Sequence, residues 1–240
     1  MTTHEVRLTQ STEIADGTMA FHFTKPAGFS FKAGQAIDLI LVDPASPDVE
    51  TLRHTFSIVA APFQGELEIA TRMRDSAYKR ALRSLPIGAT ATIEGPSGSL
   101  VLHEDRARAA VFVAGGIGIT PFMSIVRQAT QDQLPQHLRL LYSNRRPEDA
   151  AFLEELQQLE QRNKNFRMIA TMTNIGKSTQ PWSGATVSID SNFLKTSAGE
   201  LVAPIYYVAG PPTMAEEMCD TLNAMGVAGA DICSEDFYGY

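Results

Sequence analysis

The sequence of 240 residues has little of what builds metal clusters, disulfide frameworks or membrane spans. Its two cysteines, Cys219 and Cys233, are too few for an iron–sulfur cluster, or for a structural zinc site without other ligands. No apolar run approaches the roughly 20 residues that cross a bilayer, and the polar start MTTHEVRLTQ lacks the apolar core of a secretory signal. We therefore expect a cytoplasmic protein without a membrane span, a metal site or a disulfide framework.

Positive charge is also scarce. The chain has 20 Lys and Arg residues against 27 Asp and Glu residues, which gives a formal net charge of −7. This balance argues against non-specific binding of nucleic acid. The length suits one large domain or two small ones, with enough residues for a substantial core.

The first part of the chain has the pattern of short strands. Runs rich in β-branched and aromatic residues are separated by Gly, Pro and Asp, and the single helical pattern is at 75–85. About six strands at this spacing predict a small antiparallel barrel. The predicted strands are 6–10, 19–26, 35–42, 54–60, 66–73 and 90–95.

From about Arg106 onward, strands alternate with helices of 10 to 15 residues. This alternation predicts βαβ units around a parallel sheet. The expected fold is therefore an N-terminal antiparallel β-barrel, residues 1–104, followed by a C-terminal α/β parallel-sheet domain, residues 105–240, with a hinge at 100–110. The predicted strands are 109–115, 137–144, 166–173, 205–210 and 230–235, and the predicted helices are 120–131, 147–163 and 211–226.

A glycine-rich junction, AGGIGITP, follows the first strand of the second part. Ligands of open parallel sheets bind beyond the carboxyl ends of the strands. Thr120 is a candidate N-cap and Pro121 a candidate first helical residue, so the helix start would favour an anion. Gly115, Gly116 and Gly118 would let a pyrophosphate approach the backbone. The alternative is a tight turn with glycines for geometry alone.

A second strand ends in the same way. In YYVAGPPTM, Gly210 closes a buried strand, and Pro211 and Pro212 begin a helix. Two parallel strands with Gly/Pro turns at the same end are expected to face one crevice.

Several motifs, in order along the chain, resemble the ferredoxin–NADP reductase family. The stretch HTFSI resembles its Arg-x-Tyr-Ser flavin motif, and GPSGSL resembles the Gly-Pro-x-Gly-x-Phe segment that closes its barrel. GGIGITP resembles its GGxGxTP loop, AGPP its Cys-Gly-Pro-Pro turn, and SEDFYGY its Glu-x-Phe-x-Gly-Tyr ending. The resemblance covers nearly the whole chain. It implies an FAD-binding barrel and a domain for the nicotinamide nucleotide.

The resemblance assigns the flavin ring to the strand at 54–60. Phe56 and Ser57 are adjacent on this strand and point to opposite sides. The family places the aromatic side chain against the flavin and the hydroxyl near N5, and these roles carry over to Phe56 and Ser57. Phe56 as an ordinary core residue is the alternative.

The phosphate contacts depart from the family pattern. The arginine that pairs with the flavin phosphate is His54 here, a weaker partner when neutral. Arg53, Arg72 and Arg74 are candidates to replace its charge. The helix start at Ser76 and Ala77 resembles the family's second phosphate-binding segment. The cofactor-binding residues expected in this part are Arg53, His54, Thr55, Phe56, Ser57, Arg72, Ser76 and Ala77.

The second strand of the domain ends in LLYSNRRPED, and its end bears on nucleotide specificity. Ser143, Arg145 and Arg146 could hold a 2′-phosphate, which favours NADPH over NADH. Solvated loop charges are the alternative for the two arginines. Glu235 matches the C-terminal glutamate proposed to orient the nicotinamide or relay protons. Phe237 and Tyr240 compete to cover the flavin ring.

The resemblance implies an FAD-dependent NAD(P)H oxidoreductase that passes single electrons to a ferredoxin or flavodoxin. Since two cysteines cannot hold a cluster, the carrier is expected to be a separate molecule. A free-flavin or quinone reductase on the same scaffold is the first alternative. The second is a degenerate binding protein without activity, because His54 and Ala209 replace the family's Arg and Cys.

Overall fold

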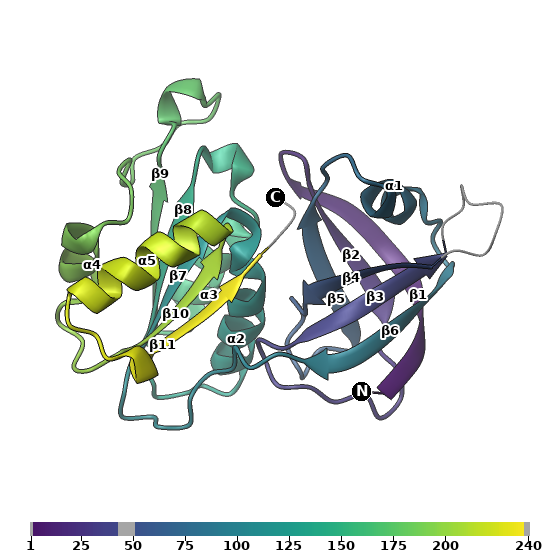
Figure 1. Ribbon diagram of the computed structural model, residues 1–240, viewed down its shortest axis with the longest axis horizontal. Coiled ribbons are helices and arrows are strands. Elements are labelled where there is room, and N and C mark those ends of the chain that lie inside the picture. The colour runs from purple at the N-terminus through teal and green to yellow at the C-terminus, as the bar shows by residue number, and fades with distance from the viewer. Residues whose placement is uncertain (1, 43–50, 238–240) are drawn as a thin grey trace.

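The computed structural model describes residues 2–42 and 51–237, and these form two sheets that lie side by side (Figure 1). The first is a six-stranded antiparallel sheet that rolls into a barrel, with the strand order β4-β3-β6-β1-β2-β5. Helix α1 (Ala77–Ser84) covers one end of it. The strands are β1 (Thr2–Ala15), β2 (Thr18–Thr24), β3 (Ala36–Val42), β4 (Thr51–Ser57), β5 (Glu66–Arg72) and β6 (Thr90–Ser97).

The barrel strands follow the two-residue period of a sheet with one buried face. In β3, Ile37, Leu39 and Leu41 enter the core, whereas Asp38 and Ile40 between them are only partly buried. The first half of the chain therefore folds as its pattern predicts, with six antiparallel strands and one helix.

The second sheet is parallel, with the order β11-β10-β7-β8-β9. Its central strand β7 is buried at every position because helices cover both faces. Ala110, Phe112 and Ala114 pack in the cluster that contains α2 and α3, and Val111 and Val113 pack in the cluster that contains α4 and α5. The strands are β7 (Ala110–Gly115), β8 (Leu138–Asn144), β9 (Phe166–Met172), β10 (Ile205–Gly210) and β11 (Ile232–Asp236).

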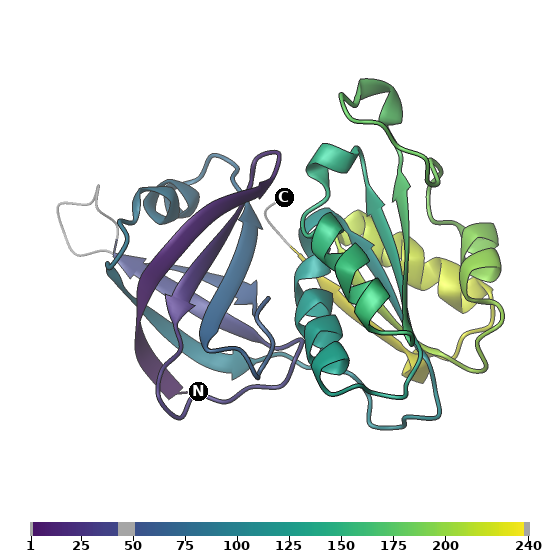
Figure 2. The ribbon, with the colours of Figure 1, turned by 180° about the vertical axis from the view of Figure 1, so that it is seen from behind.

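The helices lie in two layers, and Figures 1 and 2 show one layer each in front of the sheet. The α-helices are α2 (Thr120–Gln131), α3 (Leu153–Arg162), α4 (Ser191–Ala198) and α5 (Pro212–Ala224). Short 3₁₀ turns are η1 (Gly116–Ile119), η2 (Pro147–Asp149), η3 (Ile175–Lys177) and η4 (Gly229–Asp231). The fold class expected from the sequence is confirmed, while the boundary between residues 104 and 105 stays a prediction.

Two helix predictions need correction. The continuous helix expected at 147–163 is split into η2 and α3, because Phe152 adopts a left-handed φ of 60° and interrupts the helix. Helix α4 was not predicted, since Ser, Asn, Thr and Lys dominate its sequence SNFLKTSA and only its capping residue Asp190 marks its start.

The two sheets are joined by direct contacts of β5 and the segment after β4 with helix α2, which α3 supports through Glu155. The guanidinium of Arg127 donates to Glu68 at 2.6 Å, to the carbonyl of Val59 at 3.0 Å and to Glu155 at 2.7 Å. The hydroxyl of Ser124 donates to the carbonyl of Ala60 at 2.7 Å. Among the helices in the described ranges, none has the length and apolar character needed to cross a membrane.

Candidate functional site

A small cavity opens where the barrel meets the second sheet. The first half contributes β4, β5 and α1, and the second half contributes the turn η1 and the start of α2. Phe237, from the segment after β11, completes the lining. Side chains from both sheets and from the end of the chain thus meet at one place. The lining residues are His54, Thr55, Phe56, Ser57, Ala70, Thr71, Arg72, Lys79, Ile117, Thr120 and Phe237.

Ser57 carries an orphaned buried hydroxyl at this cavity. Its residue is 4% exposed, and its Oγ has no hydrogen-bond partner among the described residues. Phe56, its neighbour on β4, faces the barrel core and stacks on His54 at 4.6 Å between ring centroids. A buried hydroxyl without a partner costs free energy, so a ligand that forms a hydrogen bond with Ser57 would recover that cost.

The His54 side chain is uncharged and contacts its surroundings through its ring. Burial lowers the pKa of its imidazole, which leaves the ring neutral at pH 7. Its Nδ1 lies 2.8 Å from the carbonyl of Thr55, and its ring lies 5.3 Å from that of Tyr78. His54 therefore does not supply the charge of the arginine that it replaces.

Two of the arginines expected to replace that charge differ in their ion pairs and in their place relative to the cavity. Arg53 is paired with Asp38 and Glu94, each at 2.6 Å, and does not line the cavity. The hydroxyl of Thr55 also donates to Asp38. Arg72 does line the cavity, with Asp149 at 3.4 Å from its guanidinium. The structure thus brings Arg72 to the site, whereas two carboxylates engage Arg53 outside it.

Lys79 is a site residue that sequence reasoning missed. It is 6% exposed, its Nζ donates to the hydroxyl of Thr71, and the same nitrogen lies 5.0 Å from the centroid of the Phe56 ring. The helical spacing contained the signal, because Lys79 precedes buried Leu82 by three residues and so shares its face.

Helix α1 begins as expected. Ser76 is its N-cap, and its side chain accepts a hydrogen bond from the backbone N–H of Lys79 at 3.2 Å. Ser76 and Ala77 are both exposed. The helix start is therefore open to solvent beside the cavity lined by Lys79.

The glycines of the junction allow close packing of the backbone as well as the approach of a ligand to it. A Cβ on Gly118 would lie 2.2 Å from the carbonyl oxygen of Ala209, and one on Gly115 would lie 2.4 Å from Sδ of Met214. Gly116 has a left-handed φ of 53°. Close approach to the backbone of β10 therefore requires Gly118, independently of any ligand, whereas a Cβ on Gly115 would meet the movable end of the Met214 side chain.

The expected N-cap role of Thr120 is wrong. The turn η1 precedes α2 directly, so Thr120 is already the first residue of the helix and Pro121 the second. The hydroxyl of Thr120 donates to the carbonyl of Ile117 at 3.0 Å. The free backbone donors at this junction consequently belong to the 3₁₀ turn rather than to α2 itself.

The ends of β7, β8 and β10 do meet in one cleft of about 290 Å³. Ser143 of β8 pairs in register with Gly115 of β7, and Pro211 reaches the cleft from the turn before α5, which begins at Pro212. Asn144 is 6% exposed, and neither its amide nitrogen nor its oxygen has a partner among the described residues. Gly210 is buried beside Gly115, whose N lies 3.2 Å from where a Cβ on Gly210 would be.

A second cleft of about 440 Å³ adjoins the first and is lined by cations. Arg145 is exposed there, and no ion pair engages it within the described ranges. Arg146 is different, because Asp149 accepts from it at 2.8 and 3.0 Å and Asp16 at 2.8 Å. Within the described ranges, Arg145 thus has no ion-pair partner, whereas Arg146 is held by two aspartates. Arg74 and Lys177 also line this cleft.

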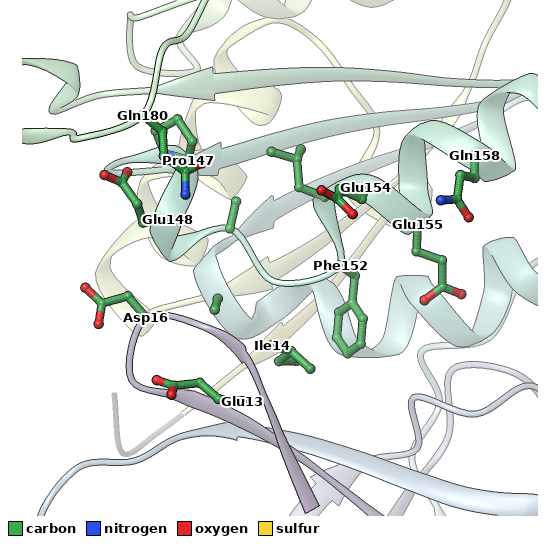
Figure 3. Close-up of a pocket in the computed structure, with 13 residues that line it drawn as sticks. Glu13, Ile14, Asp16, Pro147, Glu148, Phe152, Glu154, Glu155, Gln158 and Gln180 are labelled. Atoms are coloured by element: carbon green, nitrogen blue, oxygen red, sulfur yellow. The ribbon is translucent and has the colours of Figure 1, made fainter.

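A wider cleft of about 850 Å³ lies on the far side of Asp16 and is acidic (Figure 3). Glu13, Asp16, Glu148 and Glu154 surround it, with Phe152 at its base. Such a lining repels phosphate. The polar groups that suit a nucleotide are therefore in the two smaller clefts.

Strand β11 and Phe237 after it lie against the site. Glu235 pairs in register with Ala209 of β10, and burial raises the pKa of its carboxyl group. The backbone N–H of Phe237 donates to the carbonyl of Gly210 at 3.1 Å, which holds its ring at the cavity of Ser57. Tyr240, the competing candidate, lies outside the described residues.

Comparisons with known proteins agree with this arrangement. Residues 112–220 match the family model of the oxidoreductase NAD-binding domain. The chain is 31% identical over 134 residues to methane monooxygenase component C of Methylosinus trichosporium, covering 55% of this chain but only 38% of that protein. It is 30% identical over 168 residues to ferredoxin–NADP reductase B of Sorangium cellulosum, covering 69% of this chain and 66% of that protein. The chain thus spans less than two thirds of the length of these curated relatives.

A solved structure matches over the full length. The ferredoxin–NADP⁺ reductase of Neisseria gonorrhoeae, determined with bound FAD and NADP, superposes with a TM-score of 0.82 at 23% sequence identity, and 98% of each chain is covered. At that identity the match establishes the fold.

Proposed function

The chain belongs to the ferredoxin–NADP reductase-like family, and on that premise we propose that it is an FAD-dependent NAD(P)H oxidoreductase. It passes electrons from the nicotinamide nucleotide through the flavin to a separate one-electron carrier of the ferredoxin or flavodoxin type. The observation that carries this proposal is the cavity shared by Ser57, Lys79 and Phe237 at the junction of the two sheets.

The residue types at this cavity suit a flavin, whose ring would need Phe237 to move because the cavity itself holds about 30 Å³. The ring has apolar faces and an edge of hydrogen-bonding nitrogens and carbonyl groups. Phe237 supplies aromatic surface from the second half, Phe56 lines the cavity from the edge of the barrel core, and the hydroxyl of Ser57, without a partner among the described residues, supplies a donor for N5. When bound, FAD accepts a hydride, which carries two electrons, and releases those electrons one at a time.

The protein's own part in the reaction is to position the nicotinamide beside the flavin and to exclude water from the cavity. Ile117 and Thr120 bring the glycine turn to the same cavity as Ser57, so a nucleotide at this turn would lie next to the flavin. Hydride transfer depends chiefly on such proximity and alignment. Phe237 covers the cavity and must move aside when the nicotinamide enters.

The nucleotide site we propose is the cleft at the ends of β7, β8 and β10. Gly115, Gly116, Ser143 and Pro211 line it, and the partnerless amide of Asn144 offers both a donor and an acceptor. The adjoining cationic cleft with Arg145 supports NADPH over NADH, because a guanidinium without an ion pair is suited to a 2′-phosphate.

Glu235 is proposed to hold a proton near the nicotinamide. It lies at the carboxyl end of β11 beside Ala209, and burial favours the protonated form of its carboxyl group. The iron–sulfur cluster of a ferredoxin-type carrier would lie outside these 240 residues, because their two cysteines cannot hold one.

The test is an absorption spectrum of the purified protein, with FAD added if needed, before and after anaerobic NADPH. We expect a bound flavin spectrum that bleaches on reduction. Cytochrome c reduction is then measured with and without ferredoxin. Strong stimulation by ferredoxin supports the carrier, whereas equal rates with free FMN alone favour a free-flavin reductase. A colourless protein that binds no FAD would contradict the proposal.

A further inference from the structure

Lys79 lies in a position that is unusual for a lysine. It belongs to the third position of α1, is 6% exposed, and reaches between β4 and β5 to the cavity that also contains Ser57. Lysine is almost never fully buried unless it is paired. Its only hydrogen-bond acceptor among the described residues is the neutral hydroxyl of Thr71.

The other buried cation at the junction is fully compensated. Arg127 is 8% exposed and contacts the carboxylates of Glu68 and Glu155. Lys79 has no carboxylate within ion-pairing distance in the part of the chain that the structure describes, only the ring face of Phe56. A buried charge of this kind is costly unless an anion meets it.

We propose that Lys79 meets a negative charge of the bound flavin cofactor, which makes it a cofactor-binding residue. This rests on the proposed function. The cavity places the Lys79 ammonium beside Phe56 and Ser57, and Lys79 follows the exposed start of α1, where backbone N–H groups also attract anions. The anion has two possible sources, which are the phosphates of the dinucleotide and the ring after reduction.

Among the groups around Lys79, the ammonium of Lys79 itself is the one expected to change its protonation between pH 8 and pH 10. Burial lowers the pKa of Lys79 to about 8. Burial also lowers the pKa of His54 on β4, and burial raises the pKa of Tyr78 on α1 far above this range. Asp38 on β3 has a lowered pKa and stays ionised, and the nearby Arg72 on β5 and Arg80 on α1 are each paired with an aspartate. An anion at the cavity raises the pKa of Lys79, so flavin binding takes up a proton in this pH window.

The variant that tests the inference is Lys79→Met, which keeps the length of the side chain and removes its charge. Lys25→Met is the matched control. Lys25 also lies over a phenylalanine, 5.3 Å from the Phe31 centroid, but it donates to the carbonyls of Pro62 and Gln64 and does not line the cavity. Removal of a buried charge does not require the fold to rearrange, and circular dichroism checks both variants.

Dissociation constants of FAD, FMN and riboflavin are measured by fluorescence quenching on the full chain without flavin, at pH 7 and pH 10. The reduction potential of bound FAD is measured by equilibration with a reference dye. If the phosphates are the source, Lys79→Met weakens FAD and FMN roughly tenfold or more but not riboflavin, and raising the pH weakens wild-type binding in the same way. If the reduced ring is the source, the oxidised affinities stay unchanged and the reduction potential falls.

The inference would be overturned if Lys79→Met, like Lys25→Met, kept the flavin affinities and the reduction potential of the wild type. The proposed function would remain intact in that case. Should Lys79→Met not fold, the wild-type pH series decides. The inference is contradicted if the ratio of the FAD and riboflavin dissociation constants is the same at pH 7 and pH 10 and the potential of bound FAD changes with pH only as that of free FAD does. A wild-type chain that binds no flavin is a failure of the proposed function instead.

Discussion

Arg127 of α2 and Glu68 of β5 form an ion pair of 2.6 Å that is almost fully buried between the two halves of the protein. Their side chains are 9% and 7% exposed, and Glu155 of α3 holds the other edge of the guanidinium. The ion pair fixes β5, whose last residues line the cavity proposed for the flavin, against the helix that follows the glycine turn. It therefore sets the distance between the two proposed cofactor sites.

The first prediction follows from this pair. Glu68→Gln leaves a buried guanidinium with half of its compensation and should lower the free energy of unfolding by about 3–5 kcal/mol. Urea denaturation followed by circular dichroism measures the change. Glu5→Gln is the control, because its pair with Arg7 is exposed on both sides and should be worth under about 1 kcal/mol. Similar small losses for both variants would show that the buried pair does not hold the halves together.

The glycine turn gives a prediction about stability. In Gly118→Ala the new methyl group would meet the backbone of Ala209 at 2.2 Å, so the turn must move away from β10. We expect a loss of about 1–3 kcal/mol together with a raised KM for the nucleotide. Gly176→Ala is the control, because no atom lies within 4 Å of its new Cβ. Unchanged stability of Gly118→Ala in thermal unfolding contradicts the packing role.

Adjacent arginines should behave differently toward the two nucleotides. Arg145→Ala removes an exposed cation from the basic cleft and should weaken NADPH roughly tenfold or more while leaving NADH nearly unchanged. Arg146→Ala breaks the contacts to Asp149 and Asp16 and should lower stability, with similar effects on both nucleotides. Titration calorimetry with each nucleotide separates these outcomes. Equal losses of NADPH and NADH in Arg145→Ala are incompatible with a 2′-phosphate contact.

Much of this arrangement is readable from the sequence, because its signals are local. The period of two in β3 and the glycine and proline turns after β7 and β10 locate their elements almost to the residue. The pairing of Arg146 with Asp16, 130 residues away, is a tertiary contact that no local pattern reports. For the same reason the sequence could not separate Arg145 from Arg146.

The miss at Lys79 has another physical origin. A lysine in a helix is ordinarily exposed, so its charge argues against burial even when its spacing places it on the apolar face. A site that binds a charged cofactor breaks that rule. The left-handed Phe152 is similar, since nothing in AAFLEEL marks a break in an otherwise helical pattern.

Glu235 supplies a prediction on pH. Burial raises the pKa of its carboxyl group in the folded protein, so the folded state binds more protons than the unfolded state from about pH 4.5 upward. The stability that Glu235 contributes is present below its unfolded pKa and is lost as the pH rises through its folded pKa. Glu235→Gln should therefore be more stable than the wild type at pH 8 and should lose this advantage toward pH 4. Urea denaturation at both pH values measures it, and a constant difference contradicts the linkage.

The last prediction concerns the orphaned hydroxyl of Ser57. It is buried without a partner among the described residues, so Ser57→Ala should leave the flavin-free protein as stable as the wild type or up to about 1–3 kcal/mol more stable. In the FAD-loaded protein the same change deletes the donor proposed for N5. Flavin reduction by NADPH should then slow by roughly ten- to a thousandfold, with FAD content nearly unchanged. Anaerobic stopped-flow absorbance measures this step.

Ser124→Ala is the matched control, because its buried hydroxyl already donates to Ala60 at 2.7 Å and lies outside the cavity. That control should lose about 1 kcal/mol of stability and keep its reduction rate. If instead Ser57→Ala loses stability like the control and reduces its flavin at the wild-type rate, Ser57 is a structural residue and the flavin ring lies elsewhere.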